Sequence, residues 1–163
     1  MPNYVDNTLH IYGDREVLDR IRDEVSSDSG VLDFNTIIPI PPHSDTFFND
    51  GAITPAVLEK YGKNTAYHWC IDNWGTKWNC LDPTLDPDSE DDRLTYTFYT
   101  AWSAAIPIAK AIAAKYSVAV ELLYMDEDRG RNCGIIDVSS DGSVILQEHY
   151  AKDGEQFIER YFG

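Results

Sequence analysis

Alternation of apolar and polar residues predicts several β-strands in this chain. Over Asn3–Tyr12, Leu9 and Ile11 are separated by a polar residue, a spacing typical of a strand with one buried face. Leu94–Ala101 is rich in β-branched and aromatic residues and is the clearest strand. Further strands are predicted at Val118–Tyr124, Cys133–Ser139 and Val144–His149, the last two joined by the strong hairpin signal Asp141-Gly142.

Helical periodicity occurs between these strands. Asp14–Ser26 has an apolar stripe that includes Leu18 and Ile21, and Ser103–Tyr116 has a second stripe, with Ser103 as the expected cap. Shorter helices are predicted at Thr54–Tyr61, where Thr54 caps and Pro55 follows, at Ala66–Asn73, ended by Gly75, and at Gln156–Phe162. The remaining segments are predicted as an extended run at Val31–Ile40, a strand start at Trp78–Leu81 and an acidic loop at Asp82–Asp92.

This order of elements indicates an α+β fold, because strands and helices do not alternate as in a doubly wound sheet. We expect one domain over residues 1–163, with an antiparallel-rich or mixed sheet, the two main helices on one face and a helical segment inserted at about 42–80. Its length of 163 residues suits one compact domain. The predicted core includes Leu18, Ile21, Phe98, Ile106 and Ile112.

The segment Tyr67–Cys80 concentrates three of the four tryptophans and two of the three cysteines. Large aromatic side chains anchor whatever they pack against. We expect Trp69, Trp74 and Trp102 to be buried close together and to hold the inserted segment against the sheet. The alternative is a recognition surface formed by Trp74, Lys77, Trp78 and Trp102, on which bases or other groups stack. Lys77 then contacts an anionic group, or serves a cation–π or ion-pair contact within the protein.

Charge gives the next constraint. Twenty-eight acidic residues oppose thirteen basic ones, for a net charge of −15. This disfavours binding to nucleic-acid phosphates, which requires clustered Lys and Arg. The surplus either keeps the protein in solution by self-repulsion or presents phosphate-like charge to a basic partner. For the second interpretation we expect one contiguous acidic face, formed by Asp82, Asp86, Asp88, Glu90, Asp91, Asp92, Asp126, Glu127 and Asp128.

The sequence does not indicate a metal site, a membrane span or a signal peptide. His68, Cys70, Cys80 and Cys133 lack the paired spacing of a zinc site, and the acidic runs lack the glycine and glutamate of a calcium loop, so we expect neither metal nor cofactor. Ala101–Ala114 is too short and interrupted to span a bilayer. The N-terminal residues lack a signal-peptide pattern. With three irregularly spaced cysteines, these features predict a cytoplasmic protein that does not contact a membrane.

Four segments occur in the order found in a known family. They are Val5–Gly13, Leu32–Pro41, Trp69–Asn79, which contains Asn-Trp-Gly-Thr-Lys-Trp, and Tyr99–Ser103, which contains Thr-Ala-Trp-Ser. This chain resembles the YubB-type proteins carried by phages and conjugative plasmids. The resemblance implies a ferredoxin-like fold and a mobile-element context. Two loops depart from the family pattern: Ala104 and Ala105 replace a pair of prolines, and Asp126–Gly130 replaces a glycine-rich turn.

Two classes of function remain open. In the first, the chain is a non-enzymatic interaction protein that binds a protein partner with a basic surface, as a nucleic-acid mimic that inhibits a host defence nuclease or a nucleic-acid-binding complex. In the second, it binds a small ligand or is an enzyme, with a pocket near Trp74, Lys77 and Trp102. Residue types in this sequence give no catalytic set, so we expect the first class. The oligomeric state is left open.

Overall fold

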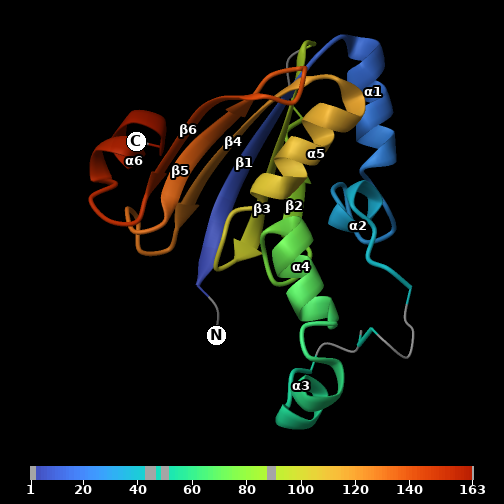
Figure 1. Cartoon of the computed structure of the whole chain (residues 1–163). Helices are drawn as coiled ribbons and strands as arrows, with labels where there is room; N and C mark the ends of the chain where they lie inside the picture. The colour runs from blue at the N-terminus through green and yellow to red at the C-terminus, as the bar shows by residue number, and fades with distance from the viewer. Residues whose placement is uncertain (1–2, 43–46, 49–51, 88–90, 163) are drawn as a thin grey trace.

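A six-stranded antiparallel sheet forms the centre of the computed structural model, which describes residues 3–42, 47–48, 52–87 and 91–162. The strand order is β2-β3-β1-β4-β5-β6 (Figure 1). The strands are β1 (Tyr4–Tyr12), β2 (Leu81–Leu85), β3 (Arg93–Ala101), β4 (Ala119–Asp126), β5 (Cys133–Val138) and β6 (Val144–Tyr150). Strands β1 to β4, with one helix after β1 and one after β3, make the βαββαβ unit of a ferredoxin-like fold, and β5 and β6 widen its sheet.

The first strand lies between two others. β1 pairs antiparallel with β3, from Tyr4 opposite Ala101 to Tyr12 opposite Arg93, and its other edge pairs with β4. Alternate β1 residues are buried, including Leu9, as the apolar–polar pattern predicts. The register therefore brings the start of β1 to the ends of β3 and β4.

Two helices cover one face of this sheet, α1 (Arg15–Glu24) and α5 (Ile106–Tyr116) (Figure 1). Their apolar stripes, including Leu18, Ile21 and Ile112, are fully buried against the sheet. The α+β fold class and the ferredoxin-like architecture are thus confirmed. Ile106 is only partly buried, since it is the first residue of α5.

The predicted start of the second main helix is wrong. Ala105, rather than Ser103, is the N-cap of α5, and it makes no side-chain cap hydrogen bond. Before the helix, Trp102 has a positive φ of 68°, and the Ser103 amide donates to the Ala101 carbonyl at 2.8 Å. This tight turn at the end of β3 delays the start of the helix by two residues.

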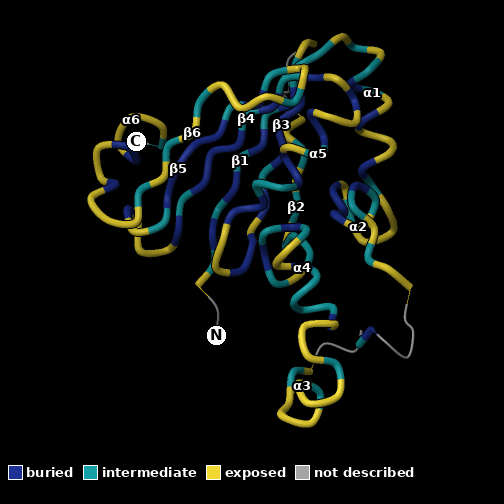
Figure 2. Tube along the Cα trace, viewed as in Figure 1, coloured by how far each residue is buried: buried dark blue, intermediate teal, exposed yellow. Residues whose placement is uncertain are grey.

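In the described part of the segment between α1 and β2, the helices are α2 (Phe34–Ile37), α3 (Pro55–Tyr61) and α4 (Ala66–Trp74). Thr54 caps α3 and Pro55 is its first residue, as predicted. The predicted extended run at Val31–Ile40 is wrong, because Asp33 caps α2 by accepting from the Asn35 amide at 2.9 Å. Helix α4 packs beside α5, whereas α3 projects away from the sheet and is mostly exposed (Figure 2).

A third correction concerns the segment after α4. The sequence predicts a strand start at Trp78–Leu81 and a loop from Asp82, but Leu81–Leu85 forms the edge strand β2 beside β3. Pro83 is tolerated there because an edge strand does not require every amide donor. The register shifts between Leu81 and Thr84. Of the predicted loop, residues 86–87 and 91–92 lie outside the strands, and residues 88–90 are not among the described residues.

The last helix, α6 (Glu155–Phe162), covers the opposite face of the sheet. Phe157 and Ile158 pack there against Leu123, Cys133 and Ile135, which alternate with the residues facing α5. β4 and β5 are therefore covered on both faces, while β1 and β3 are open on this side. In the part of the chain that the structure describes, no helix is long and apolar enough to cross a lipid bilayer.

Candidate functional site

Trp74 is a core residue of the aromatic segment. Its side chain is 1% exposed, and its indole Nε1 donates to the Ile38 carbonyl at 2.9 Å. The Phe34 and Trp69 rings meet it edge-on, with centroids 5.7 and 5.4 Å away. Gly75 ends α4 in the left-handed conformation. Trp74 and Trp69 therefore hold α4 against the core. The predicted burial is confirmed for Trp74, whereas Trp69 is only partly buried.

Trp102 does not join this cluster, and the prediction that it is buried is wrong. Its side chain is 47% exposed, and Trp78 is 40% exposed. The Lys77 ammonium lies 4.7 Å from the Trp102 ring centroid, 5.8 Å from that of Trp78 and 5.9 Å from that of Tyr67. We call these four residues, Tyr67, Lys77, Trp78 and Trp102, the aromatic edge. Each of these contacts is within cation–π range.

The backbone around Trp102 is firmly held. Its amide donates to the Asn3 carbonyl at 2.8 Å, and its carbonyl accepts from Asn132 Nδ2 at 2.7 Å. The neighbouring Ala101 amide donates to Thr76 Oγ1, and Thr76 donates back to the Ala101 carbonyl. A left-handed conformation is uncommon and costly for a bulky residue, and such strain is concentrated at functional sites. The structure thus holds an exposed indole in a fixed, strained position.

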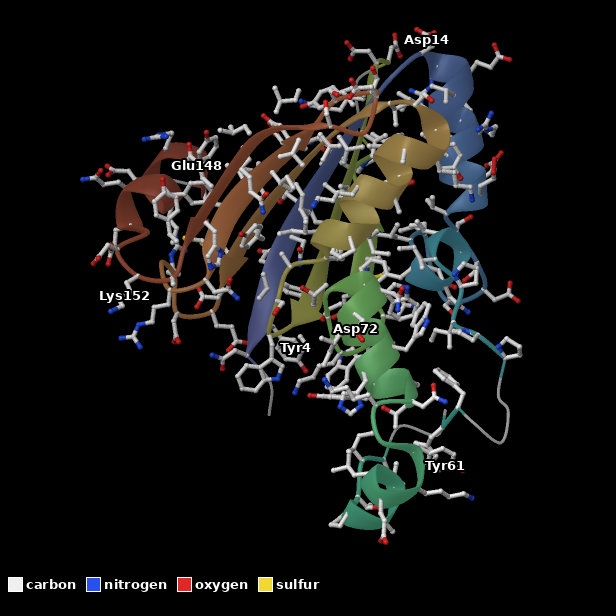
Figure 3. The ribbon with its side chains drawn as sticks, in the orientation of Figure 1. Tyr4, Asp14, Tyr61, Asp72, Glu148 and Lys152 are labelled. Carbon is white, nitrogen blue, oxygen red and sulfur yellow. The ribbon has the colours of Figure 1, made fainter. Side chains whose placement is uncertain are left out.

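A cavity of about 610 Å³ opens next to this edge, where β1 begins and β3 and β4 end. Tyr4 lies at this lower end of the sheet (Figure 3). We call this hollow the acidic cavity. Its lining residues are Tyr4, Asp6, Leu81, Asp82, Tyr99, Met125, Asp126, Glu127 and Arg129.

Four of the nine residues that line the acidic cavity are acidic. Asp126 is 5% exposed, and its Oδ1 has no hydrogen-bond partner among the described residues. Burial raises the pKa of Asp6. Glu127 accepts from the Tyr4 amide at 3.1 Å, so one carboxylate is already engaged. Arg129 is on the rim, and within the described chain it forms no ion pair with these acids.

The structure divides the predicted acidic face. Asp82, Asp126 and Glu127 come together in the acidic cavity, and Asp128 follows in the β4–β5 turn, where it lines a separate hollow. The others do not join them: the Asp86 amide donates to the Thr95 carbonyl midway along β3, and Asp91 and Asp92 precede the start of β3. Asp88 and Glu90 lie outside the described residues. Among the acids that the structure describes, Asp86, Asp91 and Asp92 therefore lie apart from the acidic cavity, because β2 carries the chain toward the other end of the sheet.

Comparison with known proteins adds the family. The family model for the ferredoxin-like domain in Api92-like proteins matches residues 73–159, more than half of the chain. The chain belongs to this family. Its fold is also similar to the crystal structure of protein api92 from Yersinia pseudotuberculosis, with a TM-score of 0.61 and 9% identity over 92% of this chain and 98% of that one. No curated protein matches this sequence.

The segment that matches the Api92-like family contains most, but not all, of the candidate site. It includes Trp78 and Trp102 from the aromatic edge and every cavity residue from Leu81 onward. Tyr4 and Asp6 come from β1, which precedes the matched segment. The cavity is therefore completed by pairing β1 with β3 and β4, and not by the family segment alone.

Sequence reasoning missed a polar row on the open face of the sheet. His10 Nδ1 lies 2.9 Å from Thr95 Oγ1, and Glu121 is opposite both His10 and Asp137 in the strand register. Burial, with the neighbouring Asp137, raises the pKa of Glu121 to about 7. Burial and the nearby Arg93 lower the pKa of His10. Alternate polar positions in β1 were the available signal, but only the register brings the row together.

The alternative small-ligand site has a physical counterpart. A hollow of about 480 Å³ is lined by Trp74, Lys77 and Trp78, although Trp102 is not part of it. Two of its polar side chains are already engaged, since Asn79 Nδ2 donates to Asp33 Oδ1 at 2.7 Å. Burial acts to raise the pKa of Asp33, but its hydrogen bonds lower it overall. These groups hold α2 in place rather than facing the hollow unpaired.

The cysteines considered for metal binding are separate thiols. Burial raises the pKa of Cys70 to about 11 and that of Cys80 to about 12. Cys133 is buried in the cluster under α6. His68 Nδ1 is 2.7 Å from Thr65 Oγ1, in the cap of α4. Within the described residues, no group of three or more His, Cys, Asp or Glu side chains is arranged to hold a metal ion.

Proposed function

We propose that this member of the Api92-like family is a non-enzymatic interaction protein that binds a protein partner with a basic surface. The aromatic edge and the adjoining acidic cavity form the binding surface in this proposal. The observation that carries it is the pair of half-exposed tryptophans, Trp78 and Trp102, the second held by backbone hydrogen bonds to Asn3 and Asn132. In the same proposal the protein is cytoplasmic and of the YubB type, encoded by a phage or plasmid.

Interface energetics support this use of the aromatic edge. Trp, Tyr and Arg are the residues that most often dominate binding energy, and they do so near the centre of an interface. A tryptophan with a fixed backbone loses little conformational freedom on binding. Lys77 lies over the rings of Tyr67, Trp78 and Trp102. It therefore orients the rings in the free protein.

Charge supports a basic partner. The net charge of −15 attracts positively charged proteins over a range set by the salt concentration. In this proposal, the carboxylates of the acidic cavity attract the basic surface of the partner to the same end of the sheet as the tryptophans. Such a combination speeds association and suppresses binding to other acidic macromolecules. A partner that normally binds nucleic acid, such as a defence nuclease, fits this chemistry, and the protein then acts as its inhibitor.

A small-ligand function at the hollow near Trp74 is the second candidate. Its volume of about 480 Å³ is within the range of ligand pockets. Commitment of Asp33 and Asn79 to the α2 cap weighs against it, because few polar groups remain to orient a ligand. The interaction proposal therefore has more support.

The test uses purified protein as bait in extract of its native host, followed by affinity measurement with the purified partner. Trp102→Ala and Trp78→Ala should each weaken binding by at least about tenfold, as expected for central aromatic contacts. Ile145→Ala is the matched control, because Ile145 is 70% exposed on β6, away from this end of the sheet. Binding should also weaken as salt rises. Equal affinity of all three variants, in any salt, contradicts the proposal.

A further inference from the structure

We infer that the rings of Tyr67, Trp78 and Trp102 form an aromatic cage for an alkylammonium group, which a lysine side chain of the partner supplies in the complex. In the free protein the ammonium of Lys77 fills this cage. The lysine source rests on the proposed function, whereas the cage is argued from its own contacts. The proposed function requires only a basic partner and exposed rings, and the inference names the cationic group that those rings receive.

Lys77 shows which chemical class the three rings accept. Its ammonium lies 4.7 Å from the ring centroid of Trp102, 5.8 Å from that of Trp78 and 5.9 Å from that of Tyr67. The face of an aromatic ring is the negative part of its quadrupole, so several rings around one point attract a cation to that point. Each of the other cations with such a contact, among the described residues, meets one ring only. The three-ring arrangement is therefore particular to this position.

The fold brings the cage together from three segments, namely α4, the connection after it and the turn after β3. Thr76 joins the last two, because its Oγ1 accepts from the Ala101 amide at 3.2 Å and donates to the Ala101 carbonyl at 2.8 Å. Thr76 directly precedes Lys77, and Ala101 directly precedes Trp102. These two bonds hold the backbone of the cation beside that of the exposed indole. The cage is thus formed in the free protein, and a ligand does not have to order it.

Lys77 can leave the cage at little cost. Within the described residues its ammonium makes no ion pair and no hydrogen bond, so the ring faces are the protein groups that hold it. Outside the cage the ammonium is fully hydrated on a flexible stem. Trp78 and Trp102 are half-exposed, and Trp78 also lines the hollow of about 480 Å³ with Lys77 and Tyr67. One ammonium can therefore replace another without a change in the backbone.

The source of the incoming ammonium follows from competition with Lys77. A tethered group acts at a high effective concentration, so a dilute free cation does not displace it easily. A partner that is already bound to the aromatic edge presents its own lysine at a comparable effective concentration. Arginine is less suited, because a guanidinium gains most from a forked pair with a carboxylate, and no carboxylate pairs with Lys77 in the described chain. The net charge of −15 draws such a lysine toward this protein.

The first experiment tests the cage with small molecules in the full chain. The probes are choline and 3,3-dimethylbutan-1-ol, which has the same shape but a carbon atom in place of the charged nitrogen. Two-dimensional NMR follows the indole N–H signals of the four tryptophans. In Lys77→Met, choline should shift the signals of Trp78 and Trp102 but not that of Trp74, which is buried. Choline should bind this variant at least about tenfold more tightly than the neutral alcohol does.

Variants locate the site and test the role of Lys77. The unchanged protein should bind choline about tenfold more weakly than Lys77→Met, as expected if Lys77 fills the cage for about nine-tenths of the time. Lys60→Met is the matched control, because it also removes one positive charge, but Lys60 lies over the single ring of Tyr61 on α3, which projects away from the sheet (Figure 1). Adding Trp102→Ala to Lys77→Met should weaken choline binding at least about tenfold. If Lys77→Met lowers the melting temperature, Lys77→Gln carries the test.

The second experiment tests the lysine source. A five-residue peptide with a central lysine is compared with the same peptide carrying norleucine, which lacks the ammonium. The lysine peptide should bind Lys77→Met at least about tenfold more tightly than the norleucine peptide does, with the same two indole signals shifted. Lys77→Met should also bind the purified partner more tightly than Lys60→Met does, because the partner no longer has to displace the internal ammonium.

Several outcomes overturn the inference. Equal binding of choline and the neutral alcohol to Lys77→Met removes the cation site, and so does full choline affinity after Trp102→Ala. Equal choline affinity in Lys77→Met and Lys60→Met removes the role of Lys77. Equal binding of the lysine and norleucine peptides, or of the partner to Lys77→Met and Lys60→Met, overturns the lysine source.

These failures are separate from failure of the proposed function. If choline does not bind the cage but Trp102→Ala still weakens partner binding, the inference is wrong and the proposed function stands. If choline binds the cage but Trp78→Ala and Trp102→Ala leave partner binding unchanged, the proposed function is wrong. The lysine source is then wrong with it, and the ammonium cage stands alone.

Discussion

Replacing Trp74 with alanine tests whether the aromatic segment is anchored by one ring while its neighbours remain available for recognition. Trp74 is 1% exposed, is bracketed edge-on by Phe34 and Trp69, and donates to the Ile38 carbonyl. The substitution removes nearly a whole buried indole and leaves a carbonyl without its donor. We therefore expect a large loss of stability with little direct effect on the exposed surface.

The magnitude follows from these contacts. Deleting a buried large aromatic side chain costs about 3–5 kcal/mol, including the cavity that remains. Loss of the donor to Ile38 places Trp74→Ala near the upper end, at about 4–5 kcal/mol. Trp74→Phe keeps a ring but loses the donor and some volume, so we expect about 1–3 kcal/mol. In a domain of this size each kcal/mol lowers the melting temperature by roughly 2–4 °C.

Urea unfolding followed by far-UV circular dichroism measures the free energy of unfolding for each variant. Trp102→Ala is the comparison, because its ring is 47% exposed, and it should cost less than about 1 kcal/mol. The slope with urea should be unchanged in both, so that midpoints report stability. A loss below about 1.5 kcal/mol for Trp74→Ala, or an equal loss for Trp102→Ala, refutes the assignment of one ring to the core and the other to the surface.

Three further predictions concern other positions. Burial and the neighbouring Asp137 raise the pKa of Glu121 to about 7, so the stability given by its protonated form is complete below its ordinary pKa and is lost as pH rises through 7. Urea unfolding should therefore show Glu121→Gln to be more stable than the unchanged protein by about 1–2 kcal/mol at pH 8, after allowance for the partial exposure of Glu121, and by almost nothing at pH 4. Gly75→Ala should lower the free energy of unfolding by at least about 1–2 kcal/mol in the same assay, because Gly75 has φ +78° and an added Cβ would lie 2.7 Å from Pro107 Cδ. An unchanged free energy of unfolding would show that the end of α4 tolerates a side chain at this position. Burial, with a nearby negative charge, raises the pKa of Cys80 to about 12, so a thiol reagent at pH 8 should leave it unmodified in the native protein and label it in urea; rapid native labelling would contradict this.

The sequence pattern was sufficient for most of the fold. Alternation located β1 and helical periodicity located α1, because in both the local apolar pattern agrees with the face that the structure buries. The β-branched and aromatic composition located β3, and β5 and β6 were located as the two strands of a hairpin. Asp141-Gly142 correctly marked a hairpin, with Gly142 at φ +87°. These elements follow from local chemistry.

The errors have non-local causes. Helix α2 lies in a run of apolar residues and prolines, and it is fixed by a hydrogen bond from the Phe34 amide to Asn79, 45 residues later. β2 exists only because β3 offers an edge to pair with. The local sequence of α2 does not show that Asn79 will bond to it, and that of β2 does not show that β3 will pair with it. The prediction for both segments therefore depended on composition alone.

The candidate site was partly predictable. Asp82, Asp126 and Glu127 were singled out from charge, and Trp78 and Trp102 from the density of aromatic residues. Their separation into an aromatic edge and an acidic cavity depends on strand register and on the left-handed backbone of Trp102. Asp6 and Tyr4 gave no signal, because an alternating strand does not show which of its polar residues will face a hollow.

The central place of β1 in the sheet also constrains how this chain acquires its structure. Its two neighbours, β3 and β4, are encoded far downstream, so β1 has no strand to pair with during the synthesis of the first half of the chain. Contacts between distant segments give a high contact order, which slows folding because long loops must close first. Until β3 is made, the backbone edges of β1 have neither of these partners and are accessible to other chains. The order of translation therefore makes the early chain dependent on protection from aggregation, and the sheet is completed only late in synthesis.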